Sequence, residues 1–112
     1  MERSHSVPLV LAGCALALLA ATQAVADTYI SDTNRTISRL GVQGSNAYFG
    51  VKEGFSVACR WGNVYVDITT DFGKAAYANL LAAKASGRVL SRVDYNQTVS
   101  ADCTLAIVEI AD

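Results

Sequence analysis

The hydrophobic pattern divides the chain into an apolar leader and a mixed remainder. Residues 7–21 form a nearly unbroken apolar run, which follows a short segment containing Arg3 and precedes Ala24-Val25-Ala26. This arrangement is typical of a secretory signal peptide with a small-x-small cleavage site, and the run is short of the ~20 residues that a membrane-spanning helix needs. We therefore predict a signal peptide at residues 1–26, a single domain at residues 27–112, no membrane span, and export to the periplasm or outside the cell.

Part of the leader also resembles a lipobox. In Leu11-Ala12-Gly13-Cys14 the cysteine would be lipidated and become the new amino terminus. The apolar run continues past it through Leu19, whereas a lipoprotein usually turns polar after its cysteine. A cysteine inside a signal helix is therefore the favoured interpretation, with lipidation of Cys14 as the alternative.

Beyond the leader, alternation of apolar and polar positions predicts several strands. The polar, turn-prone residues 27–35 are expected to form a lead-in arm. The clearest strand is 64–68, where three aliphatic side chains share one face and Tyr65 and Asp67 share the other. Further extended segments are predicted at 36–42, 47–51 and 55–61, with a hairpin-type turn at 52–54.

Helical spacing replaces alternation after residue 71. Phe72, Ala76, Leu80 and Ala83 recur at helical intervals, and Tyr77 and Leu81 widen the stripe. We predict a helix over 72–86, with Asp71 as its N-cap and Gly87 just beyond its end.

Alternation returns at residues 88–95, where Val89, Val93 and Tyr95 are expected on one side and Leu90, Arg92 and Asp94 on the other. A loop at 96–102 and a last strand at 104–110 complete the domain. Extended segments, then one helix, then two strands indicate a mainly β (α+β) domain. We predict a small OB-like five-stranded barrel with a single helix between strands 3 and 4; other small α+β sheets fit the order nearly as well.

The cysteines point to a structural disulfide. Of the three in the chain, Cys14 lies in the leader, which leaves Cys59 and Cys103 as an even pair in a predicted oxidising compartment. A redox-active or metal-binding pair would need close spacing or further ligands. We therefore predict one disulfide between Cys59 and Cys103, with no metal and no cofactor.

Charge and composition exclude several functions. Nine Lys and Arg oppose ten Asp and Glu, which gives no field to hold a nucleic acid or an anionic membrane. The only histidine, His5, lies in the leader, so imidazole-based catalysis and zinc binding are absent from the predicted mature chain. A paired-carboxylate enzyme built on Asp67, Asp71 and Asp94 is the remaining alternative. We favour structural roles instead: Asp67 on a solvated strand face, Asp71 as a helix cap, and Asp94 in an ion pair with Arg92 or a neighbouring lysine.

The aromatic residues are the better functional clue. Eight aromatic side chains lie from Tyr48 to Tyr95, both included, and aromatic faces with polar edges bind sugars and peptides. An OB barrel binds ligands on the face of its second and third strands. The candidate ligand-binding residues are Arg60, Trp61, Tyr65 and Asp67; the alternative is that these rings complete a core or a subunit interface.

The carboxy-terminal half also carries a family resemblance. The helix at 72–83, then Gly87-Arg88-Val89, Asp94-Tyr95 and Cys103-Thr104-Leu105 resemble small exported bacterial proteins of unassigned function. The same series is similar to the helix and following strand in the OB-fold binding subunits of subtilase-type AB5 toxins. The resemblance covers about the last 45 residues. It implies an OB fold, ring oligomerisation and glycan binding, and we assign no glycan-contact residue from it.

These observations together predict a small exported, non-catalytic binding module whose ligand is a glycan or a protein. A structural or assembly protein of the cell envelope, acting as a homo-oligomer, is the alternative. A small carboxylate-dependent hydrolase is the third hypothesis.

Overall fold

The computed structural model of the protein describes residues 29–112. The predicted signal peptide and the alternative lipidation of Cys14 lie outside these described residues. The elements, in chain order, are β1 (Ile30–Arg35), β2 (Ile37–Gln43), β3 (Asn46–Val51), the 3₁₀ turn η1 (Arg60–Gly62), β4 (Val64–Asp67), α2 (Asp71–Ser86), β5 (Leu90–Gln97) and β6 (Cys103–Ile110). Over this range no helix is long and apolar enough to cross a bilayer.

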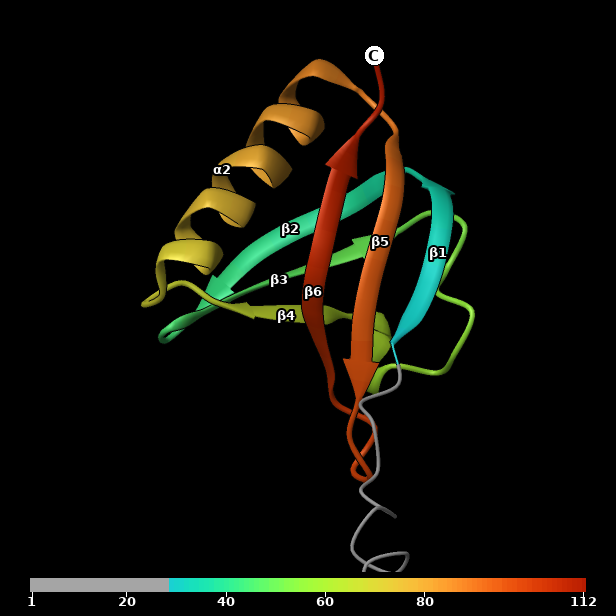
Figure 1. Cartoon of the computed structure of the whole chain (residues 1–112), viewed down its shortest axis with the longest axis vertical. Helices are drawn as coiled ribbons and strands as arrows, with labels where there is room; N and C mark the ends of the chain where they lie inside the picture. Colours follow the sequence, from blue (N-terminus) through green and yellow to red (C-terminus); the bar gives the residue numbers. More distant parts are fainter. Residues whose placement is uncertain (1–28) are drawn as a thin grey trace, which may run out of the picture.

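The strands form one strongly bent sheet, with one helix packed against it. The strand order is β1-β5-β6-β4-β3-β2, and every pair is antiparallel except β4 with β6. Strands β2, β3 and β4 run across the direction of β1, β5 and β6 (Figure 1). The prediction of a mainly β domain with one helix is confirmed.

The prediction of a five-stranded barrel is wrong in strand number. The described residues contain six strands, and no ladder joins the edge strands β1 and β2, so the sheet is not closed into a barrel. Only Thr36 separates these two strands. Its N–H donates to Glu53 Oε1 at 2.7 Å and its carbonyl accepts from Lys52 N at 2.9 Å. The turn at 52–53 therefore uses the backbone groups of Thr36, and one long extended stretch becomes two strands.

The prediction of an arm at the start of the domain is also wrong. Residues 27–35 were expected to form an arm, yet Ile30–Arg35 pairs with β5, with Ile30 opposite Tyr95. β1 is an edge strand with one fully inward polar residue, Asp32, which is 4% exposed. Its sequence therefore lacks the apolar alternation on which strand prediction depends.

The helix is close to its predicted position, but its cap and its buried face differ. Thr70 is the N-cap, because its Oγ1 accepts from Gly73 N at 2.9 Å; Asp71 is the first helical residue. Gly87 ends the helix in the left-handed region, as predicted. Phe72 was expected on the buried face of the helix, but it is exposed, and Gly73 is buried instead. A Cβ on Gly73 would lie 1.7 Å from the carbonyl oxygen of Asp67, so only glycine permits this close approach of α2 to β4.

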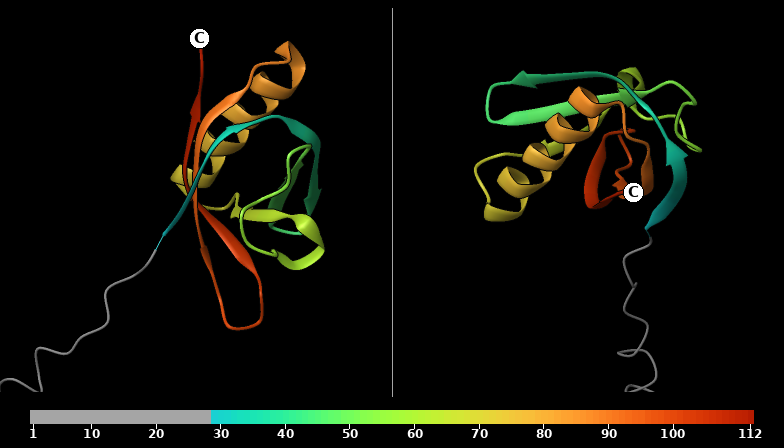
Figure 2. Two further views of the ribbon diagram at one scale, coloured as in Figure 1. Left: turned by 90° about the vertical axis from the view of Figure 1, so that its right-hand side faces the viewer. Right: turned by 90° about the horizontal axis from the view of Figure 1, so that it is seen from above.

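The core lies between the bent sheet and α2, which contacts β2, β4 and β6 (Figure 2). Its largest fully buried side chains include Tyr95, Phe49, Leu80 and Leu90. Leu90 was expected on the opposite side of β5 from Tyr95. A register shift between Leu90 and Arg92 reverses the alternation there and turns Leu90 inward.

Candidate functional site

The predicted disulfide is confirmed and fixes one end of the candidate site. Cys59 and Cys103 are joined, with their Cα atoms 5.5 Å apart, and both are buried. Cys59 directly precedes the turn η1, and Cys103 is the first residue of β6. The bond therefore ties the segment at 55–62, a loop and turn rather than the predicted extended segment, to the sheet.

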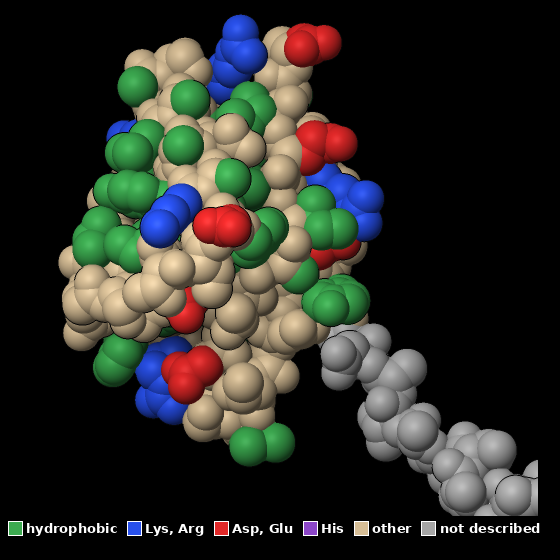
Figure 3. All heavy atoms as spheres, turned by 60° about the vertical axis from the view of Figure 1, so that its left-hand side comes forward, with side chains coloured by type: hydrophobic (Ala, Val, Ile, Leu, Met, Phe, Trp, Pro, Cys, Tyr) green, Lys and Arg blue, Asp and Glu red, His purple; other side chains and the backbone are tan. Residues whose placement is uncertain are grey.

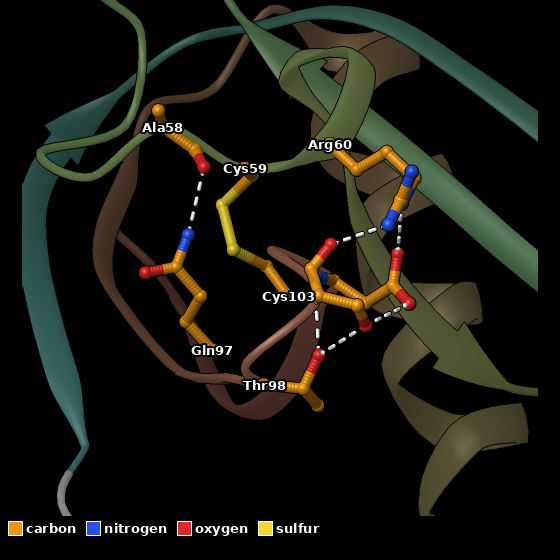
Figure 4. Close-up of polar contacts among 8 residues, drawn as sticks. Ala58, Cys59, Arg60, Gln97, Thr98 and Cys103 are labelled. Atoms are coloured by element: carbon orange, nitrogen blue, oxygen red, sulfur yellow. Dashed lines mark hydrogen bonds and ion pairs between the residues drawn. A yellow bond between two sulfur atoms is a disulfide. The ribbon is translucent and has the colours of Figure 1, made fainter.

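Further contacts fasten the same turn to the β5–β6 loop (Figure 4). Arg60 N donates to Ala101 O at 2.8 Å, and Arg60 Nε lies 2.7 Å from Asp102 Oδ1. Arg60 Nη2 also donates to the Ser100 carbonyl. The hydrogen bond from Arg60 holds the pKa of Asp102 below its usual value. Because this carboxylate stays charged and paired, the turn is held at ordinary pH.

Trp61 lies on this turn with an exposed side chain and an unusual backbone conformation. Its side chain is 72% exposed, and its backbone is in the left-handed region at φ 54° and ψ 19°. Outside glycine that conformation costs about 1–2 kcal/mol. Arg39 stabilises it, since Arg39 Nη2 donates to the Trp61 carbonyl at 2.7 Å and to Asn63 Oδ1 at 2.7 Å. The exposed indole is thus carried on a fixed backbone.

Two glycines let large side chains lie flat on the outward face of β2, β3 and β4. Gly41 pairs with Tyr48, and a Cβ on Gly41 would lie 2.5 Å from the Tyr48 ring. Gly50 pairs with Arg39, and a Cβ there would lie 2.8 Å from the guanidinium carbon. Tyr48 in turn faces Tyr65 across β3 and β4, with ring centroids 5.9 Å apart. The result is an aromatic floor with a guanidinium at one end.

Two neighbouring hollows open on this face, and three residues line both: Gln43, Trp61 and Tyr65. The first hollow has a volume of about 580 Å³, and its other lining residues are Arg39, Val42, Tyr48 and Asn63. The second has a volume of about 310 Å³, and its other lining residues are Asn46, Asp102, Cys103 and Thr104. We call the two hollows together the groove.

The four candidate residues have different places relative to the groove. Trp61 and Tyr65 line both hollows. Arg60 lies over the Trp61 ring, with its guanidinium carbon 5.6 Å from the ring centroid, so it supports the indole from one side. Asp67 lines neither hollow: its Oδ1 accepts from Thr69 N at 2.9 Å and from Thr69 Oγ1 at 2.6 Å. These bonds lower the pKa of Asp67.

Sequence reasoning missed Arg39, Tyr48 and Asn63 as groove residues. The available signal was the pair of glycines inside β2 and β3, because a glycine within a strand often marks a close approach. Recognising it requires the cross-strand register, which places Gly41 opposite Tyr48 and Gly50 opposite Arg39.

Two of the carboxylates proposed for a hydrolase, Asp67 and Asp94, are bound by neighbouring side chains of the protein. Asp94 is buried on β5, and its Oδ2 lies 2.6 Å from Arg92 Nη2; this hydrogen bond lowers the pKa of Asp94. Asp71 begins α2. Within residues 29–112, no three His, Cys, Asp or Glu side chains form a group that could hold a metal ion.

Comparisons of the chain with protein-family models, curated proteins and solved structures found no match. On the face drawn in Figure 3, acidic and basic side chains are interspersed among apolar ones and form no patch of one sign.

Proposed function

We propose that this protein is an exported, non-catalytic binding module of the OB type, and that its ligand is a glycan bound in the groove. The observation that carries this proposal is Trp61: an exposed indole on a strained, multiply anchored turn that lines the same hollow as Tyr48 and Tyr65. Strained residues persist where the surrounding structure fixes them, and they cluster at functional sites.

The topology supports the OB assignment. If β1 and β2 are counted as one strand that bends at Thr36, the strand order is that of a five-stranded OB barrel. Helix α2 then lies between the third and fourth strands in the chain. β3 and β4 are then the second and third strands, whose face is the ligand-binding face in OB domains. The two loops that flank such sites are here the β2–β3 turn and the β5–β6 loop. Gln43, Asn46 and Asp102, at the ends of these loops, line the groove.

The lining chemistry supports a sugar over a polyanion. Tyrosine and tryptophan faces take the apolar faces of sugar rings, and amide side chains bind their hydroxyl groups. Among the described residues, Arg39 is the only cation that lines the groove. A nucleic acid would need several.

A glycan array and the single tryptophan of the chain test the proposal. We expect the mature protein to be retained by a limited set of glycans, and a bound glycan to shift Trp61 fluorescence to shorter wavelength as water leaves the ring. Trp61→Ala and Tyr65→Ala should each weaken retention at least about tenfold. Phe72→Ala removes an exposed aromatic side chain on α2, outside the groove, and serves as the control. Absence of retention on every sugar would refute the glycan proposal.

The second candidate function is assembly into a coat or ring. It is favoured by the edge strands β1 and β2 and by exposed apolar side chains away from the groove, including Val89 and Ile107. Light scattering of the mature protein tests it, since a strict monomer at all concentrations would contradict assembly.

The hydrolase hypothesis has less support, because Asp67 and Asp94 are each held by other residues of their own region. Activity on a glycan that survives Asp67→Asn with Asp94→Asn would exclude these two carboxylates as its catalysts.

A further inference from the structure

The groove is longer than a single sugar ring. Its lining residues come from four neighbouring strands, β2, β3, β4 and β6. Neighbouring strands lie about 4.8 Å apart, so the groove crosses about 14 Å of the sheet. Within it, Tyr48 and Thr104 lie on opposite sides of Tyr65, two strand spacings or about 10 Å apart.

The middle of the groove is marked by the two aromatic residues that line both hollows, Trp61 and Tyr65. Arg60 occupies one side of the indole, which leaves its other face for a ligand. This geometry suits a ligand that continues from one hollow to the next past the ring.

The charged groups at the two ends are already used within the protein. Arg39 directs its Nε and Nη2 atoms to Asn63 and to the Trp61 carbonyl. Asp102 is paired with Arg60. The remaining polar lining consists of amides and hydroxyls, namely Gln43, Asn46, Thr104 and the two tyrosines. Such groups complement the hydroxyl groups of a neutral sugar.

We infer that the groove binds a linear chain of at least two neutral sugar units, with one unit in each hollow and the linkage beside Trp61 and Tyr65. This inference rests on the proposed glycan function and adds the length and charge of the ligand. Tyr48 belongs to the first subsite and Thr104 to the second. A β-1,4-linked chain of equatorial sugars fits best, because it is extended and presents flat ring faces to aromatic side chains.

The test measures affinity as a function of chain length. Glucose and β-1,4-linked glucose oligomers of two to five units, and the corresponding N-acetylglucosamine series, are titrated into the mature protein. Trp61 fluorescence and calorimetry report binding. We expect affinity to rise at least about tenfold between one unit and three, and then to level off once both hollows are filled.

Two matched variants on β6 localise the effect. Thr104→Arg fills the second hollow with a long side chain, and we expect it to remove the gain in affinity with chain length. Ile107→Arg makes the same change at an exposed position of β6 outside both hollows, and it should bind like the wild type. Circular dichroism of both variants shows whether the fold is kept.

The outcomes separate the inference from the proposal beneath it. Equal affinity for one and for several units, or an unchanged chain-length profile in folded Thr104→Arg, would overturn the inference while the glycan function stood. Retention only of charged glycans, with neither neutral series bound, would do the same. If no glycan of any kind is retained, the proposed function fails and the inference fails with it.

Discussion

Two groups of aromatic and polar side chains lie on different parts of the sheet. The group around Asp32 is buried and hydrogen-bonded within the protein, whereas the groove around Trp61 is open to solvent. Around Asp32, Tyr95 Oη donates to Oδ2 at 2.7 Å and Ser56 N donates to the same oxygen at 3.0 Å. Arg35 Nη2 lies 3.5 Å from Oδ1. Asp32 and Tyr95 are both buried. In the groove, by contrast, Trp61 is exposed and the hollows beside it are open.

The contrast shows that residue type alone does not identify a site. Burial raises the pKa of Asp32, but the hydrogen bonds from Ser56 and Tyr95, helped by Arg35, outweigh burial and bring the pKa below its usual value. Both carboxylate oxygens are engaged by the protein itself. The Asp32 cluster therefore holds β1, β5 and the 52–59 loop together, while the groove keeps polar groups available to a ligand.

Loss of the disulfide should have the largest effect on stability. Cys59 follows the loop that contacts Asp32 and precedes the turn that carries Trp61, so the bond supports both regions. Replacing Cys59 and Cys103 together with alanine should lower the free energy of unfolding by about 4 kcal/mol, the chain-entropy value for a loop of this length. Urea unfolding followed by circular dichroism measures it. A loss below about 1 kcal/mol would show that the bond contributes little to the stability of the folded domain.

Asp32→Ala acts on the buried cluster alone. It removes the acceptor of Tyr95 Oη and Ser56 N, and we expect a loss of about 3 kcal/mol, since hydrogen bonds to a charged group contribute about 1.5–3 kcal/mol each. Affinity in the groove, measured below the unfolding transition, should remain that of the wild type. Asp67→Ala on the exposed face is the matched control, and it should change stability much less than Asp32→Ala. Equal losses in the two variants would contradict the distinction between the clusters.

The pH dependence of stability should have the same origin. The folded pKa of Asp32 is depressed, so its contribution is present above the unfolded pKa, near 4, and is lost as pH falls through the folded pKa. We expect the melting temperature of the wild type to fall below about pH 4, and to fall less steeply in Asp32→Asn. An unchanged slope in the variant, measured by thermal melts from pH 6 to pH 2.5, would assign the acid sensitivity to other carboxylates.

The two regions also explain which predictions the sequence supported. Helix α2, β3 and β4 were predictable because each depends on local signals: a periodic stripe, alternation and a terminal glycine. β1 was not, since Asp32 is stabilised inside by Tyr95, 63 positions away. The face of Leu90 depends on a register shift against β6, which no local pattern encodes.

The candidate site was predictable to a similar extent. Trp61 and Tyr65 were found as aromatic residues near a clear strand, and both line the groove. Asp67 was chosen because it shares a strand face with Tyr65, but its carboxylate is taken by the adjacent Thr69. Arg39 and Tyr48 become groove residues only through their cross-strand glycines, and pairing between strands is set by the tertiary fold.

Gly41→Ala tests whether the position of Tyr48 in the groove controls binding. The new Cβ would lie 2.5 Å from the far end of the Tyr48 side chain, which can move aside, so we expect a stability loss of only about 1 kcal/mol. Affinity should fall severalfold because the floor of the first hollow is displaced. In a Tyr48→Ala background the same change should have no further effect on affinity. An additive loss in that double-mutant cycle would show that Gly41 acts through another residue.

At Trp61, the smallest expected change in stability accompanies a large loss of binding. Trp61→Gly relieves a left-handed backbone that costs about 1–2 kcal/mol in other residues, while the added freedom of glycine in the unfolded chain costs about 1 kcal/mol. The free energy of unfolding should therefore stay within about 1 kcal/mol of the wild type, whereas Trp61→Ala, which keeps a Cβ in the same conformation, should be no more stable. Both variants should bind the glycan at least about tenfold more weakly than the wild type. If Trp61→Gly instead unfolds like Asp32→Ala, the indole belongs to the structural framework and the division between a closed cluster and an open groove is wrong.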